Sequence, residues 1–503
     1  MSGEGEFEMA TAPTASEQHC GHPLLSGGHQ TQVTTQLRIL ADDQIKDLHW
    51  ATLEVLERTG VYVQHEEARD LLRGAGARVD QERVYIPSFL VESALRTAPS
   101  NVTIYRRTGE PLAFLGGKRV YFATYSEAAW ILDPYTGQRR RFTSEDYRLI
   151  ARATEASPYM VALGGGGAAS DIPPEFRCQA SFKYCTSHTT KALLVTTGES
   201  SGLADVVEMA AMIAGSHEQL RARPFILPKC EPTAPLSHVR EAIEMLLMMA
   251  RAGLPVVYYS MTAAGSTAPC SGAGALVVAN AEVLSGLVIH QLARPGAPFV
   301  YGVMPGMMDM STTVWAYGSP DFLLLSAAAA ELSQYYHLPM MGTGGCSDAK
   351  DLDMQCAAEV ALGCLLAAQS GTNLVHDVGL LDSTQMVSPA QIVLADEVLG
   401  MVLHLTRRVD TSAAGLQLDL IDRVGPRGEF LTAESTYRDF KEFWYPQVFG
   451  RRRYDQWQKA GAQSVLDRLN ERTCKLIEDV EVRPLPAEVA SDLDGREQKW
   501  RQG

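Results

Sequence analysis

The stretch Leu338–Gln355, "LPMMGTGGCSDAKDLDMQ", joins a short apolar run to an Ala-rich helical segment through three glycines and several acidic residues. The apolar run does not alternate with polar residues, which is typical of a strand buried on both faces. A buried strand followed by a helix is the repeating unit of a parallel sheet. This stretch therefore predicts one β-loop-α unit.

Six further runs of the same kind recur about every 30–45 residues. They are "YMVALGGGG" (159–167), "ALLVTTGES" (192–200), "PFILPKCEPTAPL" (224–236), "LPVVYYSMTAAGS" (254–266), "PFVYGVMPG" (298–306) and "NLVHDVGLLD" (373–382). Seven or eight such units favour an α/β fold, the TIM (β/α)8 barrel. A doubly wound open sheet is the alternative, although no strand runs into a G-x-G-x-x-G turn that opens a helix.

The flanking segments have a different composition from the centre. Residues 1–35 are rich in Ser, Gly, Thr, His and Gln, which predicts a disordered tail. Helical and alternating β patterns over 36–145 predict an N-terminal helix-plus-hairpin cap, and the barrel is expected over 146–425. Residues 426–503 are expected to form a C-terminal helical extension.

Composition and charge exclude several classes of protein. The chain has 503 residues, 46% of them apolar, with a net charge of −15, whereas a nucleic-acid partner would favour a basic face. We see no apolar run of membrane-spanning length and no secretory signal, so we expect a cytoplasmic protein without a membrane partner. Nine cysteines, an odd number, are read as reduced thiols rather than a disulfide framework.

The carboxyl ends of barrel strands form the active face, so the residues there are the candidates for a binding site. Aromatic and acidic groups dominate this set, which favours a cation with an apolar surface, since each aromatic face contributes roughly 0.5–2 kcal/mol. Successive strand residues point to opposite faces, so at most one of Tyr258 and Tyr259 faces the interior. The candidate substrate-binding residues are Glu231, Tyr259, Tyr301, Cys346, Asp348 and His376.

Metal and nucleophile motifs are missing from the sequence. It contains no C-x-x-C, no H-E-x-x-H and no G-x-S-x-G between a strand and a helix. Cys178, Cys185 and His188 share a helix face at a wider spacing than zinc sites use, so we expect them to pack that helix on the barrel. We predict no metal site, and no residue can be named as a catalytic group.

Several phrases, in this order, resemble the trimethylamine methyltransferase family over about Leu40 to Val480. They are "LDPYTGQRRRFTSEDY", "KCEPTAPL", "MGTGGCSDAKDLDMQCAAE", "NLVHDVGLLDSTQMVSPAQIVLADEVLGM" and "VGPRGEFL". The resemblance implies a TIM barrel and transfer of a methyl group from an amine to the cobalt of a separate corrinoid protein. The archaeal trimethylamine enzymes carry pyrrolysine, whereas this chain has standard residues only, as in the branch associated with quaternary amines such as glycine betaine.

The resemblance also bears on cofactors and partners. The nearest match to a cobalt-binding D-x-H-x-x-G phrase is Asp47–Thr52, which lacks the glycine. We therefore expect no tightly bound cofactor, a corrinoid protein as partner, and a homo-oligomer, as the family suggests. Cobalt(I) attack on a quaternary amine releases a neutral amine and requires no general acid.

Two alternatives remain at this point. Glu231, Asp348 and His376 are also suited to acid–base work in a hydrolase or lyase. A barrel that binds betaine without transferring its methyl group is the other reading. His376, Lys350 and the backbone of Gly344–Cys346 are all candidates for holding a substrate carboxylate.

Overall fold

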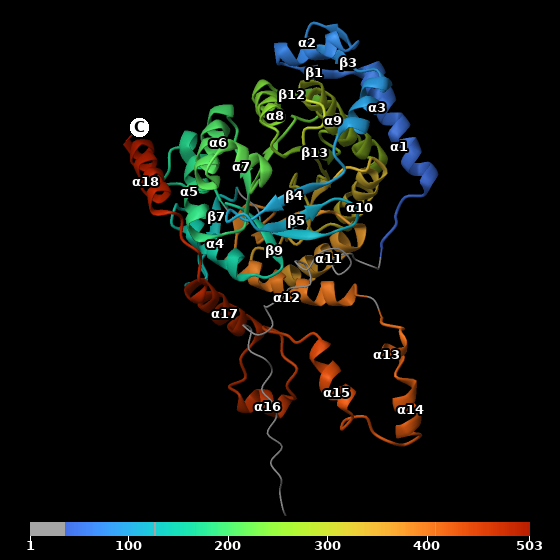
Figure 1. Ribbon diagram of the computed structural model, residues 1–503, viewed down its shortest axis with the longest axis vertical. Helices are drawn as coiled ribbons and strands as arrows, with labels where there is room; N and C mark the ends of the chain where they lie inside the picture. The colour runs from blue at the N-terminus through green and yellow to red at the C-terminus, as the bar shows by residue number, and fades with distance from the viewer. Residues whose placement is uncertain (1–35, 125–126, 166, 408, 503) are drawn as a thin grey trace, which may run out of the picture.

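The protein is built around a closed barrel of eight parallel strands, seen in a computed structural model that describes residues 36–502 apart from 125–126, 166 and 408 (Figure 1). The expected disordered tail, 1–35, lies outside the described residues. The strands are β6 (Tyr121–Thr124), β9 (Met160–Gly164), β10 (Ala192–Thr196), β11 (Ile226–Cys230), β13 (Val256–Ala264), β14 (Phe299–Met307), β15 (Met340–Thr343) and β16 (Leu374–Val378). Closure between β6 and β9 confirms the TIM barrel and excludes the open sheet.

The first barrel strand corrects the expected domain boundary. All seven apolar runs are barrel strands, but the eighth, β6, lies within the 36–145 segment that was assigned to the cap. This strand is four residues long and follows a β-hairpin, so its pattern resembles the hairpin strands before it. The last barrel helix ends at Leu405, so the barrel covers 121–405 rather than 146–425.

Eight helices cover the outside of the barrel. They are α4 (Asp146–Ala156), α5 (Arg177–His188), α6 (Ser200–Ala214), α8 (Arg240–Ala252), α9 (Gly272–Ala293), α10 (Pro320–Tyr335), α11 (Met354–Ser370) and α12 (Pro389–Leu405). α11 shows how the sequence sets a helix boundary: the Asp353 carboxylate accepts a hydrogen bond from the Cys356 amide, and Gly371 ends the helix in the left-handed conformation.

One of these helices, α9, meets the length and composition criteria for a membrane-crossing helix among the described residues. However, 72% of its most apolar 18-residue window is buried inside the protein. This burial is what the core helix of a large barrel requires, so α9 is weak support for a membrane span.

The N-terminal segment packs its helices against α9 and lays a hairpin across the amino-terminal end of the barrel. It contains α1 (Asp42–Glu54), a π-helical turn (Val55–Thr59), β1 (Val61–Val63), α2 (Glu66–Gly74), β2 (Arg78–Asp80), β3 (Arg83–Tyr85), α3 (Ser88–Thr97) and the hairpin β4 (Val102–Tyr105) with β5 (Pro111–Leu115). The Tyr105 amide donates to the Pro224 carbonyl and the Arg107 amide to the Thr190 carbonyl. Thr190 and Pro224 stand just before β10 and β11, so the hairpin lies across the end opposite the active face.

A small second sheet lies at the carboxyl end of the barrel. Its strands are β7 (Trp130–Leu132), β8 (Arg139–Arg141), β17 (Leu380–Leu381) and β18 (Met386–Val387). β7 and β8 follow β6, whereas β17 and β18 follow β16, so two neighbouring barrel strands feed the same sheet. This sheet is well placed to frame the barrel mouth.

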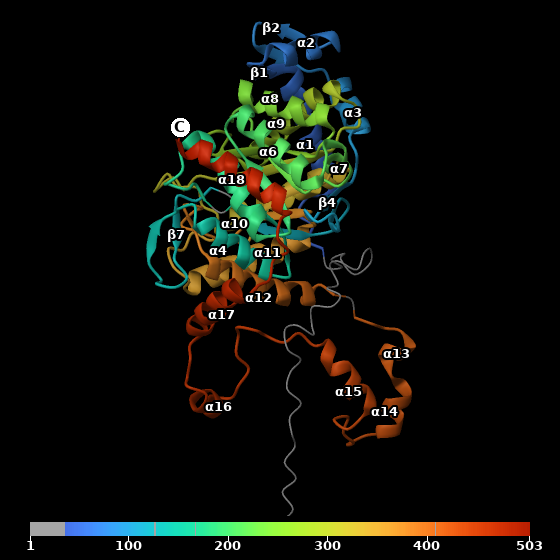
Figure 2. The same ribbon diagram turned by 60° about the vertical axis from the view of Figure 1, so that its left-hand side comes forward.

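The C-terminal extension has a part that packs on the barrel and a part that projects from it (Figures 1 and 2). α17 (Val465–Asp479) packs on α4 and α12, and α18 (Ala487–Gln502) crosses α5 and α6. The projecting part holds α13 (Ala413–Leu416), α14 (Leu418–Val424) and α15 (Glu434–Asp439), and the short α16 (Tyr454–Lys459) precedes α17. The extension thus begins after Leu405, about twenty residues before the expected boundary at 426.

Candidate active site

A chain of polar contacts crosses the interior of the barrel near the carboxyl ends of its strands. The Tyr259 hydroxyl on β13 lies 2.6 Å from Nε2 of His376 on β16 and 2.9 Å from Oγ1 of Thr343 on β15. All three residues are buried. Strands on different sides of the barrel therefore bring these side chains together at its centre.

The two adjacent tyrosines of β13 point in opposite directions, as the strand geometry predicts. Tyr259 faces the interior, whereas the Tyr258 hydroxyl lies 2.6 Å from Nδ1 of His238, outside the barrel wall. Burial raises the pKa of both phenols well above the usual value, and the charge of Asp377 raises that of Tyr259 further. Tyr259 is therefore a neutral hydrogen-bond donor at physiological pH.

His376 and Asp377 form a buried pair in an irregular part of β16. Nδ1 of His376 lies 2.5 Å from Oδ1 of Asp377, and both side chains are almost fully buried. The pairing of β16 with β6 shifts register between Val375 and Val378, and Asp377 has a φ of 77° in the left-handed region. A bulge of this kind redirects side chains, which lets two consecutive residues meet.

The hydrogen-bond partners assign the His376 tautomer. A carboxylate only accepts hydrogen bonds, so Nδ1–H of His376 donates to Asp377. Nε2 is then the acceptor for the Tyr259 hydroxyl. The structure thus places His376, a candidate site residue from the sequence, in the polar chain next to Asp377, which was not among those candidates.

Lys229 is the residue of the cluster that sequence reasoning missed. Its Nζ lies 2.5 Å from Oε1 of Glu231 and 5.1 Å from the centroid of the Tyr259 ring, and its side chain is only 3% exposed. The sequence signal for Lys229 is the spacing "KCE", in which it stands two residues before Glu231. Residues i and i+2 of a strand share a face, so Lys229 accompanies Glu231.

Tyr301 does not join the cluster, which corrects one expected site residue. It pairs in register with Tyr258, so it faces outward, and its hydroxyl donates to Oδ1 of Asn280 on α9 at 2.9 Å. The inward position belongs to Gly302, where an added Cβ would lie 2.5 Å from Cδ2 of Tyr259. Gly302 thus provides the space that the Tyr259 ring occupies.

Cys346 and Asp348 have separate surroundings after β15. Burial raises the pKa of the Cys346 thiol well above its usual value, and the charges of Asp377 and Asp348 raise it further. The thiol therefore stays protonated, and it lines the site rather than acting as a nucleophile. The Asp348 carboxylate accepts hydrogen bonds from the amides of Tyr317 and Gly318 and from Ser383 Oγ, so it joins two loops of the mouth instead of facing the polar chain.

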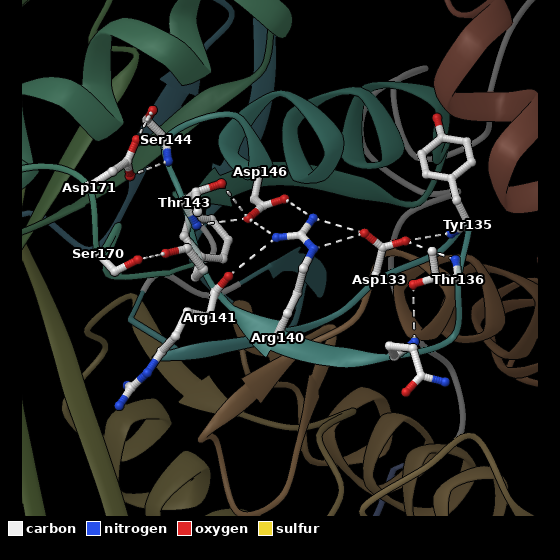
Figure 3. A network of polar contacts seen from close by, with 12 residues as sticks. Asp133, Tyr135, Thr136, Arg140, Arg141, Thr143, Ser144, Asp146, Ser170 and Asp171 are labelled. Carbon is white, nitrogen blue, oxygen red and sulfur yellow. Dashed lines mark hydrogen bonds and ion pairs between the residues drawn. The ribbon is translucent and has the colours of Figure 1, made fainter.

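A network of ion pairs around Arg140 fixes the β7–β8 hairpin beside the mouth (Figure 3). Arg140 donates two hydrogen bonds to Asp146 on α4, at 2.7 and 2.6 Å, and one to Asp133 at 2.9 Å. The hydrogen bonds to Asp146 are the largest cause of the raised pKa of Arg140. Because bidentate pairs fix orientation, the hairpin is held rigidly against the barrel.

A cavity of about 500 Å³ lies between α5 and the outer faces of β9 and β10. Cys178, Ser181 and Cys185 line it, so the two cysteines only partly fill the space beneath α5. Burial raises the pKa of both thiols to about 12. No cluster of three or more His, Cys, Asp or Glu residues with metal-binding geometry occurs in the part of the chain that the structure describes.

The segment nearest to a cobalt-binding phrase is part of the protein core. His49 is 3% exposed, with Nδ1 3.2 Å from the Tyr336 hydroxyl and Nε2 3.1 Å from Oε1 of Glu92. Both ring nitrogens thus have partners within the fold. A histidine in this setting does not fit as a cobalt ligand.

Comparisons with known proteins agree on one family. The family described as trimethylamine methyltransferase (MTTB) matches residues 14–500. The trimethylamine methyltransferase MttB of Desulfitobacterium hafniense is 34% identical over 90% of this chain and 92% of its own length. The glycine betaine methyltransferase of another Desulfitobacterium hafniense strain is 32% identical over 85% of this chain and 90% of its own length.

Among solved structures, the monomethylamine methyltransferase MtmB of Methanosarcina barkeri aligns with 88% of this chain and 93% of its own chain. The TM-score is 0.48 and the identity 10%. The family match spans the barrel, the N-terminal segment and the C-terminal extension alike. The chain therefore belongs to the trimethylamine methyltransferase family and is a methyltransferase enzyme of the EC 2.1.1 type.

Proposed function

We propose that this methyltransferase takes its methyl group from a zwitterionic quaternary amine of the glycine betaine type and gives it to the cobalt(I) of a separate corrinoid protein. The observation that carries the proposal is the ion pair of Lys229 and Glu231 beside the Tyr259 ring. A betaine has one positive and one negative group, and so does this pair.

Charge balance favours a zwitterion over a simple cation. The betaine ammonium takes the place of the Lys229 ammonium near Glu231 and the Tyr259 ring, while the betaine carboxylate binds Lys229. The buried Lys229 ammonium keeps an opposite charge beside it throughout this exchange, which avoids the large cost of an uncompensated buried charge. Trimethylammonium supplies no carboxylate, so its binding adds positive charge beside Lys229.

The reaction depends on the orientation of the substrate methyl group and needs no proton transfer. The C–N bond breaks with its electron pair left on nitrogen, a bond forms between the methyl carbon and cobalt, and a neutral tertiary amine leaves. The residues of the barrel hold the ammonium, turn one methyl group toward the mouth and exclude water from the methyl carbon. The rigid Tyr259–His376–Asp377 chain positions the ring against which the ammonium rests.

The partner and the assembly follow from the same proposal. The corrinoid protein docks over the barrel mouth, framed by the β7–β8 hairpin, and supplies the cobalt. The enzyme holds no tight cofactor of its own, works in the cytoplasm and forms a homo-oligomer.

Calorimetry with a matched set of ligands tests the substrate class. Glycine betaine should bind at least ten-fold more tightly than tetramethylammonium, which has the same cationic head and no carboxylate. Equal affinities, or tighter binding of tetramethylammonium, would remove Lys229 from the binding site.

A second function is favoured by one observation. The Asp377–His376–Tyr259 chain has the order of an acid–base relay, with a carboxylate orienting an imidazole that contacts a hydroxyl. A hydrolase or lyase would use such a relay without any corrinoid. Turnover of a betaine in the absence of every corrinoid would support that function in place of methyl transfer.

A further inference from the structure

The segment 409–443, which we call the arm, leaves the barrel without packing on it. α12 ends at Leu405, and after the buried Thr406 the next buried residue in the described part of the chain is Val448. No residue between 409 and 443 is buried, and Figures 1 and 2 show α13, α14 and α15 standing away from the body of the protein. The arm therefore has no core of its own.

The arm exposes an unusual amount of apolar surface. Its exposed large apolar residues are Val409, Leu416, Leu418, Ile421, Phe430, Leu431, Tyr437 and Phe443, with exposures from 42% to 86%. Side chains of this size at these fractions expose on the order of 100 Å² each. Together they offer an area of the same order as the ~800 Å² per partner found in stable interfaces.

The helices of the arm are too short to be ordered by themselves. α13, α14 and α15 have four, seven and six residues. Isolated helices below about 12 residues are marginal in water, because nucleation is costly. An arm of this kind needs a partner that is present whenever the protein is folded.

The place where the arm departs excludes the barrel mouth as its target. α12 starts after β16 at the mouth and runs antiparallel to the strands, so Leu405 lies at the opposite end of the barrel. The chain returns at the same helix, where the Glu397 carboxylate accepts hydrogen bonds from the amides of Gln447, Val448 and Phe449 at 3.0–3.1 Å. A protein docked over the mouth would not reach an arm anchored here.

A receiving surface exists on the same chain. The exposed large apolar residues of the barrel helices in the described structure all lie on three neighbours: Leu324 and Tyr335 on α10, Met354 and Leu362 on α11, and Met401 and Leu405 on α12. We call this the α10–α12 face. Large apolar side chains exposed on neighbouring helices of a soluble protein often mark a protein–protein contact.

We propose that the arm of one copy covers the α10–α12 face of a second copy, and that the reciprocal contact closes a two-fold symmetric dimer. The arm leaves from the edge of that face, so a two-fold axis near the end of α12 lets each copy both donate and receive. Obligate interfaces are more apolar than transient ones, in keeping with the composition of both surfaces. This inference does not depend on the substrate.

Sedimentation of the full chain at 1–50 μM tests the proposal with three double variants. The wild-type protein should sediment as a dimer. Leu418→Asp with Ile421→Asp in the arm, and Leu324→Asp with Leu362→Asp on the face, should each weaken the dimer at least 100-fold. Tyr62→Asp with Phe89→Asp, exposed on β1 and α3, is the matched control and should leave the dimer intact.

A mixing experiment separates the proposed pairing from general damage to the fold. A heterodimer of the arm variant and the face variant keeps one unaltered arm on one unaltered face. Mixing should therefore restore dimers at least ten-fold more tightly than either variant alone. A monomeric wild-type protein at 50 μM, arm variants that dimerise like wild type, or a mixture without rescue would each overturn the proposal.

Discussion

The Tyr259 hydroxyl lies 2.6 Å from Nε2 of His376, although 117 residues separate the two along the chain. This contact joins β13 to β16 across the barrel interior and connects the aromatic ring to the buried Asp377. It makes Tyr259 both an apolar surface for a cation and the end of a polar chain.

Tyr259→Phe should keep the aromatic ring but lose the hydrogen bond between the hydroxyl and His376. We expect kcat to fall about 10- to 100-fold, because the ring and His376 lose their fixed orientation, while the affinity for betaine changes less than three-fold. Tyr258→Phe is the matched control on the outer face, and it should leave kcat unchanged. If both variants behaved alike in steady-state kinetics, the interior contact would have no special role.

Lys229→Met should remove the group that binds the substrate carboxylate while keeping a side chain of similar length. We expect KM for glycine betaine to rise at least ten-fold, with little change in the affinity for tetramethylammonium. Competition experiments with the two ligands measure both effects. An equal loss for both ligands would show that Lys229 supports the fold and does not recognise a carboxylate.

Gly302→Ala should displace the Tyr259 ring, since the new Cβ would lie 2.5 Å from its Cδ2. Activity is expected to fall at least ten-fold with a modest loss of stability. Gly286→Ala provides the comparison, because there the Cβ would lie 2.3 Å from Cδ1 of Tyr258, outside the barrel. That variant should lower the melting temperature without a specific loss of kcat, and the reverse pattern would contradict the assignment of the two faces.

Glu282, behind β13, should make folding stability depend on pH. Burial raises the pKa of its carboxyl to about 7, against hydrogen bonds from Ser260 and Leu236 that lower it. Below pH ~4.5 both states are protonated, but between pH ~4.5 and ~7 the unfolded state ionises while the native state keeps its proton. Stability therefore falls as the pH rises through this window, by up to ~3 kcal/mol.

Urea unfolding of Glu282→Gln from pH 5 to pH 8 checks this linkage. The amide does not titrate, so the variant should gain stability relative to wild type as the pH rises to 7 and then hold a constant difference. The exposed Glu241→Gln on α8 should show no such trend. A constant difference between Glu282→Gln and wild type across the range would mean that Glu282 is ionised throughout.

The sequence predicted the barrel well, because a buried parallel strand leaves a clear apolar pattern. All seven runs, including "LPMMGTGGCSD", are barrel strands, and Asp353 caps the helix that follows "LPMMGTGGCSD". The sequence did not predict β6 as a barrel strand. Its four buried residues follow a hairpin, and so short a run does not distinguish a barrel strand from a hairpin strand. The boundary at Leu405 was not predicted, because the barrel helix α12 is followed by further helical segments without a clear break.

The site was only partly predictable, because the sequence shows which residues follow each strand but not in which direction their side chains point. The structure brings the predicted Tyr259 and His376 into contact, whereas the register of Tyr301 with Tyr258 turns Tyr301 outward. Asp377 meets His376 because of a bulge in β16, and no sequence pattern predicted this bulge. Lys229 was within reach, as it stands two residues before Glu231 on the same face.

Transfer of a methyl group from glycine betaine to cobalt(I) tests the central claim most directly. The purified enzyme is mixed with betaine and a reduced corrinoid, free or on its protein, and methylated cobalt and dimethylglycine are measured together. We predict one equivalent of each, with Tyr259→Phe and Lys229→Met both impaired. Methyl transfer from trimethylamine but not from betaine, or betaine turnover without any corrinoid, would contradict the account.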